Sequence, residues 1–113
     1  MKLRQKELSG GIVLFEIEGN IVGGPDAMSL NDEVRKLVDG GKKKFVIDMG
    51  SVEHINSSGL GILIASLNVV RQAGGDLKVA NVSSRVLDLL KITKLNQIFK
   101  LYNSVDEAVK NLA

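Results

Sequence analysis

The sequence contains no cysteine in its 113 residues, which excludes thiol chemistry. A chain without thiols has no disulfide framework, no thiolate metal site and no cysteine nucleophile. The same absence fits a reducing compartment. We expect no metal site, and the residues indicate no cofactor.

The net charge is small, and aromatic side chains are scarce. Fifteen Lys and Arg stand against thirteen Asp and Glu, which gives a net charge of +2, and aromatic residues make up 4% of the chain. This charge is too small to supply the long-range field on which binding to a phosphate backbone relies. Few rings are left to stack on unpaired bases. We therefore expect no direct nucleic-acid partner.

Long hydrophobic runs are missing as well. The most apolar stretch, residues 60–70, is broken by Ser66 and Asn68, which argues against a transmembrane span. Residues 1–7 lack the apolar core of a secretory signal. These absences predict a cytoplasmic protein without membrane insertion.

The composition that is present, 44% hydrophobic and 25% charged, is ordinary for a soluble globular chain. The length suits one compact domain and leaves no room for a second full core, so we expect a single domain over residues 1–113. Paired glycines punctuate the chain into elements, because glycine accepts the positive φ of turns. The pairs are Gly10-Gly11, Gly23-Gly24, Gly40-Gly41 and Gly74-Gly75.

Short runs of β-branched and apolar residues predict the strands. Residues 12–18 end in alternation, and residues 3–8 can pair with them as a hairpin across Ser9 and Gly10. The continuous apolar run at 45–49 is typical of a strand buried on both faces, so it should be central in the sheet. Two further strands are expected at 77–80 and 98–102.

Helices are predicted where apolar residues recur at three-to-four spacing behind a start signal. The start signals are Pro25, the capping residues Asn56 and Ser83, and the capping box at 104–107. Gly40 ends the first helix. The inner faces are expected to carry Met28 or Ala27, Leu30, Val34, Leu37 and Val38; Leu60, Leu63, Ile64, Leu67 and Val70; Val86, Leu87 and Leu90; and Val105, Ala108, Val109 and Leu112.

The order of these elements, two strands followed by alternating helices and strands, is typical of an α/β domain. We predict a mixed sheet of four to five strands with a mainly parallel core, packed with about four helices. The sequence shows no internal repeat and leaves the strand order open.

Nucleotide-binding loops are excluded by single residues. Residues 59–61 resemble the opening of a dinucleotide-binding loop, but Ile64 stands where a third glycine is needed. Residues 41–42 resemble the end of a phosphate loop, yet Lys43 replaces the serine or threonine that would bind magnesium.

The other candidates for chemistry form no set of nucleophile, base and orienting acid. For His54, in a loop, a solvated side chain is favoured over a catalytic base. For Asp48, at the end of the central strand, a structural role is favoured over a catalytic one. For the three lysines at 42–44, we favour solvated side chains that discourage aggregation over a nucleic-acid contact. We predict that the protein is not an enzyme and has no catalytic residue.

A helix start within residues 46–63 carries the functional signal. With Asn56 as the cap, Ser57 lies where free N–H groups and the positive helix end would tolerate a phosphate. Small hydroxylated residues favour helix starts in any case. Gly59 and Gly61 are less ordinary, since each is about 1 kcal/mol less favourable than alanine inside a helix. Close approach of a backbone, a partner or the core would explain them.

Residues 56–61, Asn-Ser-Ser-Gly-Leu-Gly, resemble the hallmark of the STAS family, the domain of sulfate transporters and anti-sigma factor antagonists. In that family Asp-Ser-Ser or Asp-Ser-Thr is followed by Gly-Leu-Gly after a buried strand. The resemblance extends more loosely over nearly the whole chain, with the family's Gly-x-Ile at 19–21 and a glycine pair at 74–75 after the long helix. It implies a STAS fold.

The resemblance also implies that Ser57 is phosphorylated by an anti-sigma factor that is itself an ATP-dependent serine kinase. The unmodified antagonist binds the kinase and frees the sigma factor, and a serine phosphatase is a further implied partner. Asn56 replaces the family's usual aspartate, and Val22 stands where many antagonists have one. The residues expected to contact the partner are Asn56, Ser58, Gly59, Leu60, Gly61, Ile21, Val22 and Gly23.

Two other functions stay open. The same frame suits a constitutive subunit of a signalling scaffold or of a lipid-transport ABC complex. An enzyme or nucleotide-binding domain is the third hypothesis, which the lack of a catalytic set disfavours.

Overall fold

In residues 2–22 and 24–112, which the computed structural model describes, five strands form one sheet in the order β1-β2-β3-β4-β5. The first pair is antiparallel and the other neighbours are parallel, so the predicted mixed sheet with a parallel core is confirmed. The apolar run at 45–49 lies in the central strand, as expected. The strands are β1 (Lys2–Leu8), β2 (Ile12–Glu18), β3 (Lys44–Ser51), β4 (Asp76–Ala80) and β5 (Lys100–Tyr102).

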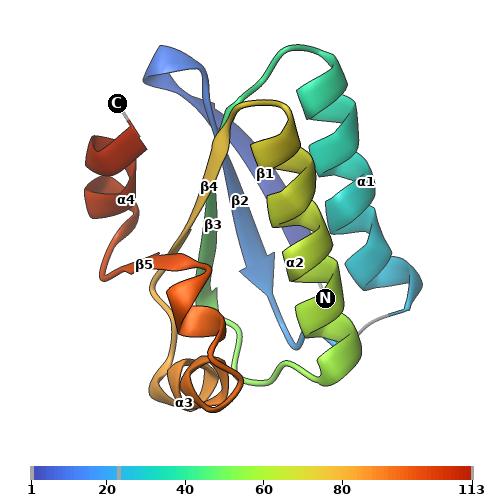
Figure 1. Ribbon diagram of the computed structural model, residues 1–113, viewed down its shortest axis with the longest axis vertical. Helices are drawn as coiled ribbons and strands as arrows, with labels where there is room; N and C mark the ends of the chain where they lie inside the picture. Colours follow the sequence, from blue (N-terminus) through green and yellow to red (C-terminus); the bar gives the residue numbers. More distant parts are fainter. Residues whose placement is uncertain (1, 23, 113) are drawn as a thin grey trace.

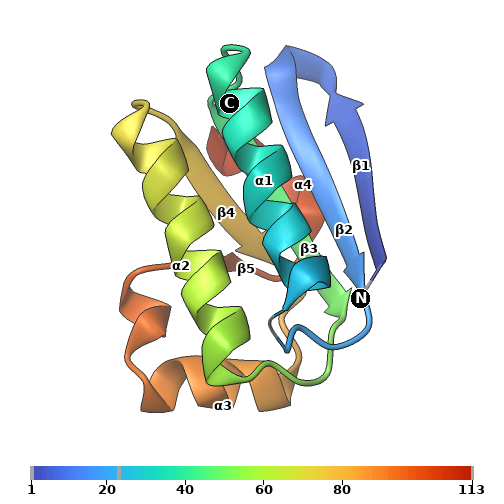
Figure 2. The ribbon, with the colours of Figure 1, turned by 90° about the vertical axis from the view of Figure 1, so that its right-hand side faces the viewer.

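Helices cover both faces of this sheet. Figures 1 and 2 show α1 and α2 side by side on one face, α4 on the opposite face, and α3 across the end where the parallel strands finish. In the same described ranges the helices are α1 (Pro25–Asp39), α2 (Ser57–Gln72), α3 (Ser84–Ile92) and α4 (Val105–Leu112), with short 3₁₀ turns η1 (Ser9–Gly11) and η2 (Leu95–Gln97).

The core is divided into two layers by the sheet. On the side of α1 and α2, the stacked rings of Phe15 and Phe45 have centroids 6.2 Å apart, and Leu67 of α2 is buried in the same cluster. On the other side, Val46 packs in a cluster with Ala108 of α4. Because both faces of β3 are covered, its middle is apolar at successive positions.

The predicted start signals coincide with the observed helix starts. Pro25 occupies the first turn of α1. Asn56 and Ser83 each accept a backbone N–H three residues further along, at 2.9 and 3.2 Å, and Ser104 does the same at 3.1 Å in front of α4. These bonds satisfy N–H groups that have no partner inside the helix.

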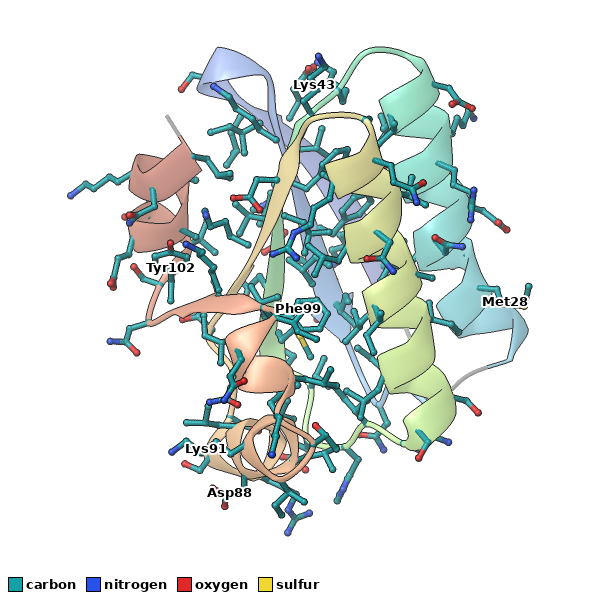
Figure 3. All side chains as sticks on the ribbon, viewed as in Figure 1. Met28, Lys43, Asp88, Lys91, Phe99 and Tyr102 are labelled. Carbon is teal, nitrogen blue, oxygen red and sulfur yellow. The ribbon has the colours of Figure 1, made fainter. Side chains whose placement is uncertain are left out.

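The last strand is shorter than predicted. The sequence indicated a strand at 98–102, but only the final three residues pair as β5. The N–H groups of Ile98 and Phe99 both donate to the carbonyl oxygen of Leu95, at 3.0 and 2.9 Å, and are therefore used within a turn. Phe99 points into the core from this turn (Figure 3).

One of the two alternatives given for the start of the inner face of α1 is excluded. Met28 is 55% exposed and points away from the body of the protein (Figure 3). The alternative, Ala27, lies outside the residues whose side chains are described. Ile64, also expected on an inner face, is half-buried and packs against the core, whereas Leu87 is half-buried.

A lysine is buried beneath α4. Lys78 is 5% exposed, and its Nζ lies 2.7 Å from Asp76 Oδ2 and 5.7 Å from the centroid of the Tyr102 ring. Tyr102 lies on the side of the sheet that faces α4 (Figure 3). The carboxylate and the ring face thus compensate a cation that is largely removed from water.

We expect Asp76→Ala to lower the free energy of unfolding by about 2 kcal/mol, because it leaves the Lys78 ammonium buried without its counter-charge. Lys78→Met removes the cation as well as its cost of burial and should change stability by less than about 1 kcal/mol. Urea denaturation of both variants measures the difference. Equal losses in the two would contradict this account of the pair.

Candidate partner-binding site at the start of α2

The start of α2 is a capped turn with two serines in solvent. Asn56 is extended, with φ −99° and ψ 179°, and its Oδ1 accepts the Gly59 N–H at 2.9 Å. The cap predicted from the sequence is therefore confirmed. Ser57 and Ser58 follow as the first two helical residues, and both are exposed. The hydroxyl of Ser57 is reachable by another macromolecule.

The backbone of Ile21 joins the end of β2 to this helix start. It forms a parallel bridge with Ile55, its N–H donates to the His54 carbonyl at 3.0 Å, and its own carbonyl accepts the Asn56 N–H at 3.2 Å. The Ile21 side chain is fully buried, and that of Leu60 is 6% exposed. Both residues were expected to contact a partner, but their side chains belong to the core beneath the exposed start of α2.

Asn56 makes a second contact that the sequence did not indicate. Its Nδ2 donates to the carbonyl oxygen of Val22 at 2.8 Å. One side chain thus caps α2 and holds the chain that follows β2. The Val22 side chain is 54% exposed beside it. Gly23, also expected at the partner surface, lies outside the described residues.

The two glycines of the motif have different surroundings. A Cβ at Gly59 would lie 2.3 Å from the carbonyl oxygen of Ile21, a separation that real Cβ atoms do not show. Close approach of the chain's own backbone therefore explains this glycine. A Cβ at Gly61 would meet nothing within 4 Å, and the residue is exposed. Packing within the domain does not account for Gly61.

The first turn of α2 suits an anion. It contains no acidic residue. Asn56 accepts the N–H groups of Gly59 and Leu60, the second through its backbone oxygen at 2.9 Å. For the N–H groups of Ser57 and Ser58, the described part of the chain supplies no acceptor. These groups form the positive end of the helix dipole.

Two other candidates from the sequence have ordinary roles. Asp48 Oδ1 accepts the Gly50 N–H at 3.0 Å and an Asn81 Nδ2–H at 3.1 Å, so it ties the end of β3 to the residue after β4. His54 is exposed, and its Nε2 lies 2.9 Å from Nη1 of Arg85. No sequence signal pointed to Arg85, because the contact joins residues 31 positions apart.

The three lysines at 42–44 lie at the end of the molecule opposite α3. Lys42 pairs with Glu7 of β1, and Lys43 points into solvent (Figure 3). Across the described ranges, no three His, Asp or Glu residues gather in an arrangement able to hold a metal ion. In those ranges, too, every helix is too short or too polar to traverse a bilayer.

The fold is shared with a known family. A family model for the STAS domain matches residues 4–108. The chain belongs to the STAS domain family. The resemblance carried by residues 56–61 is thereby confirmed.

Relatives of this STAS domain are known from sequence and from structure. The anti-sigma-B factor antagonist of Bacillus subtilis is 32% identical over 89 residues, which cover 76% of this chain and 81% of that protein. A Thermotoga maritima protein of solved structure matches with a TM-score of 0.88 at 22% identity, over 97% of this chain and 93% of the other. SpoIIAA of Bacillus in its phosphorylated form matches with a TM-score of 0.79 at 12% identity, over 99% of this chain and 100% of the other. At such identities the structural matches show a shared fold.

We expect Gly59→Ala to lower the free energy of unfolding by about 2 kcal/mol or more, although alanine is the better helix former. The added methyl group would lie 2.3 Å from the Ile21 oxygen, so the helix or the end of β2 must shift. Gly61→Ala, in the same turn but in open space, is the matched control. Urea denaturation measures both, and an equal change would show that the contact with Ile21 is unimportant.

Proposed function

We propose that this STAS domain is an anti-sigma factor antagonist whose binding to an anti-sigma factor serine kinase is controlled by phosphorylation of Ser57. The observation that carries the proposal is the exposed Ser57 hydroxyl at the first helical position of α2. Support also comes from the likeness to the Bacillus subtilis antagonist and to SpoIIAA, which has been solved in a phosphorylated form.

In the proposed cycle the unmodified domain docks on the kinase, and the sigma factor is released. Phosphorylation of Ser57 ends the docking, and a serine phosphatase restores the hydroxyl. The domain thereby regulates sigma-dependent transcription without contacting nucleic acid and without catalysing a reaction. The cycle belongs in the cytoplasm, where the kinase has access to ATP.

A phosphate would affect the free domain and the complex differently. It adds about −1.5 to −2 charges at neutral pH. In the free domain it would lie at a positive helix end whose first turn carries no acid. In a complex the same dianion would be withdrawn from water, which without a matching cation costs far more than the roughly 1.4 kcal/mol of a tenfold loss in affinity. The fold would survive while the complex is lost.

Gly61 supports a close approach of the partner at this point. It lies four residues after Ser57, so the two share one face of α2 a turn apart. A glycine inside a helix is about 1 kcal/mol less favourable than alanine, and internal packing does not require this one. A helix position without a side chain lets the backbone of a docked protein approach closely there.

A second candidate function is favoured by the neutral cap. Asn56 places no negative charge beside Ser57, where the family usually has aspartate. The domain would then be a constitutive subunit of a signalling scaffold or of a lipid-transport ABC complex. The same face would hold its partner whether or not Ser57 is modified.

Ser57→Ala should abolish the incorporation of phosphate when the domain is incubated with ATP and the anti-sigma factor kinase encoded near its gene. Ser58→Ala, the exposed neighbour, is the matched control and should still be modified. Intact-protein mass spectrometry measures both. Phosphate retained in Ser57→Ala would place the modification elsewhere, and no phosphate on the wild-type domain would reject the switch.

Ser57→Asp should weaken binding of the same kinase by at least about tenfold in titration calorimetry, because it adds a charge to the docking face. Unchanged affinity would favour the constitutive subunit.

Gly61→Ala should change stability and binding in opposite directions. The free energy of unfolding should rise by about 0.5–1 kcal/mol, since alanine is the better helix former and its methyl group meets nothing. Affinity for the kinase should fall by about tenfold, because the added methyl group would clash with the backbone of the docked partner. A variant that is more stable and binds equally well would show that Gly61 lies outside the interface.

A further inference from the structure

The orientation of the Asn56 amide is determined by two backbone groups of opposite kind. Its oxygen faces a donor, the Gly59 N–H at 2.9 Å, and its nitrogen faces an acceptor, the Val22 carbonyl at 2.8 Å. A flipped amide would satisfy neither contact. An aspartate could accept from Gly59, but its second oxygen would face the Val22 carbonyl with no proton between them. The contact to Val22 therefore depends on asparagine.

Val22 is consequently held in place although its side chain is in solvent. On its N-terminal side, Ile21 is fastened to His54 and Asn56 by backbone hydrogen bonds of 3.0 and 3.2 Å. Its own carbonyl is held by the Asn56 amide. The residue is 54% exposed, and its backbone is bonded to Asn56, which caps the turn that bears Ser57. A single exposed valine is ordinary, but one fixed beside a proposed docking face is preorganised to bind.

We infer that Val22 is an apolar anchor that determines which anti-sigma factor this domain binds, and that Asn56 is the residue that positions it. This inference rests on the proposed function. The partner would offer an apolar recess to the isopropyl group. A basic recess would find no counter-charge in the first turn of α2, which contains no acid. The pair Asn56 and Val22 thus selects a partner by shape and hydrophobicity.

The first test changes the polarity of the anchor. Val22→Asp should weaken binding of the unphosphorylated domain to the purified anti-sigma factor by about thirtyfold or more, because an unpaired charge would enter an apolar recess. Val22→Thr, which keeps the shape, should weaken it by about fivefold. Ile92→Asp is the control, since Ile92 is 79% exposed at the α3–η2 corner, apart from the β2–α1 connection in Figures 1 and 2. Calorimetry should find that Ile92→Asp binds the anti-sigma factor with an affinity within about twofold of wild type.

The outcomes distinguish a failure of the inference about Val22 from a failure of the proposed function. Wild-type binding that Val22→Asp does not weaken overturns the anchor and leaves the function standing. Binding that is lost equally in Ile92→Asp also overturns the anchor, since the effect would not be specific to Val22. No binding of the wild-type domain overturns both.

The second test addresses the positioning role without a partner. Asn56→Asp keeps the cap and should change the ratio of folded to unfolded protein by less than about fivefold, which corresponds to less than about 1 kcal/mol in the free energy of unfolding. The Ile21 N–H, bonded to His54 in the native domain, should exchange with solvent about tenfold faster once the Val22 carbonyl is released. Unchanged exchange would overturn the positioning role.

Binding data complete this test as a double-mutant cycle. Asn56→Asp should weaken binding by about fivefold in the wild-type background and have little further effect in Val22→Asp, because the anchor it positions is already gone. Additive losses would mean that Asn56 contacts the partner independently, and would overturn the coupling.

Discussion

The contact between the Ile21 backbone and the first turn of α2 is the constraint on which the site depends. Gly59 allows the helix to approach so closely that a side-chain carbon would lie 2.3 Å from the Ile21 oxygen. That same oxygen accepts the Asn56 N–H, which sets the backbone of the cap residue. Only because the cap is placed in this way can its side chain reach Gly59 with one end and Val22 with the other.

The helix start separates structural from exposed positions by its own periodicity. Gly59 and Leu60 turn toward the sheet and are buried, whereas Ser57, Ser58 and Gly61 turn toward solvent. Successive residues of a helix point in different directions, so one turn can serve the core and present a surface. A chemical change on the outer positions therefore leaves the contacts with Ile21 undisturbed.

Local signals predicted much of the fold. The Asn56 cap, the central strand at 45–49 and the first turn at Pro25 each depend on a few neighbouring residues. The strand expected at 98–102 failed because the amides that it needed are used by a turn onto Leu95, and apolar content alone does not reveal that competition.

The capped start of α2 was predictable in its position and only partly in its construction. Gly59 and Gly61 look alike in the sequence, and they differ only in what lies opposite each of them in space. The hydrogen bond between Asn56 and Val22 joins residues 34 positions apart, so no local pattern could announce it. Contacts of this kind arise from the topology that brings the end of β2 next to α2.

The neutral cap determines where the free energy of a phosphate switch would arise. An aspartate at position 56 would repel a phosphate on Ser57, so part of the effect would appear in the free domain. With an amide at that position this repulsion would be absent, so the modified and unmodified domains would differ less in their own stability. The difference in affinity must then come from the docked complex, and its sign depends on the surface that faces Ser57. A cationic surface would bind the phosphate, whereas the apolar surface that suits Val22 would exclude it, which makes release the consequence of phosphorylation.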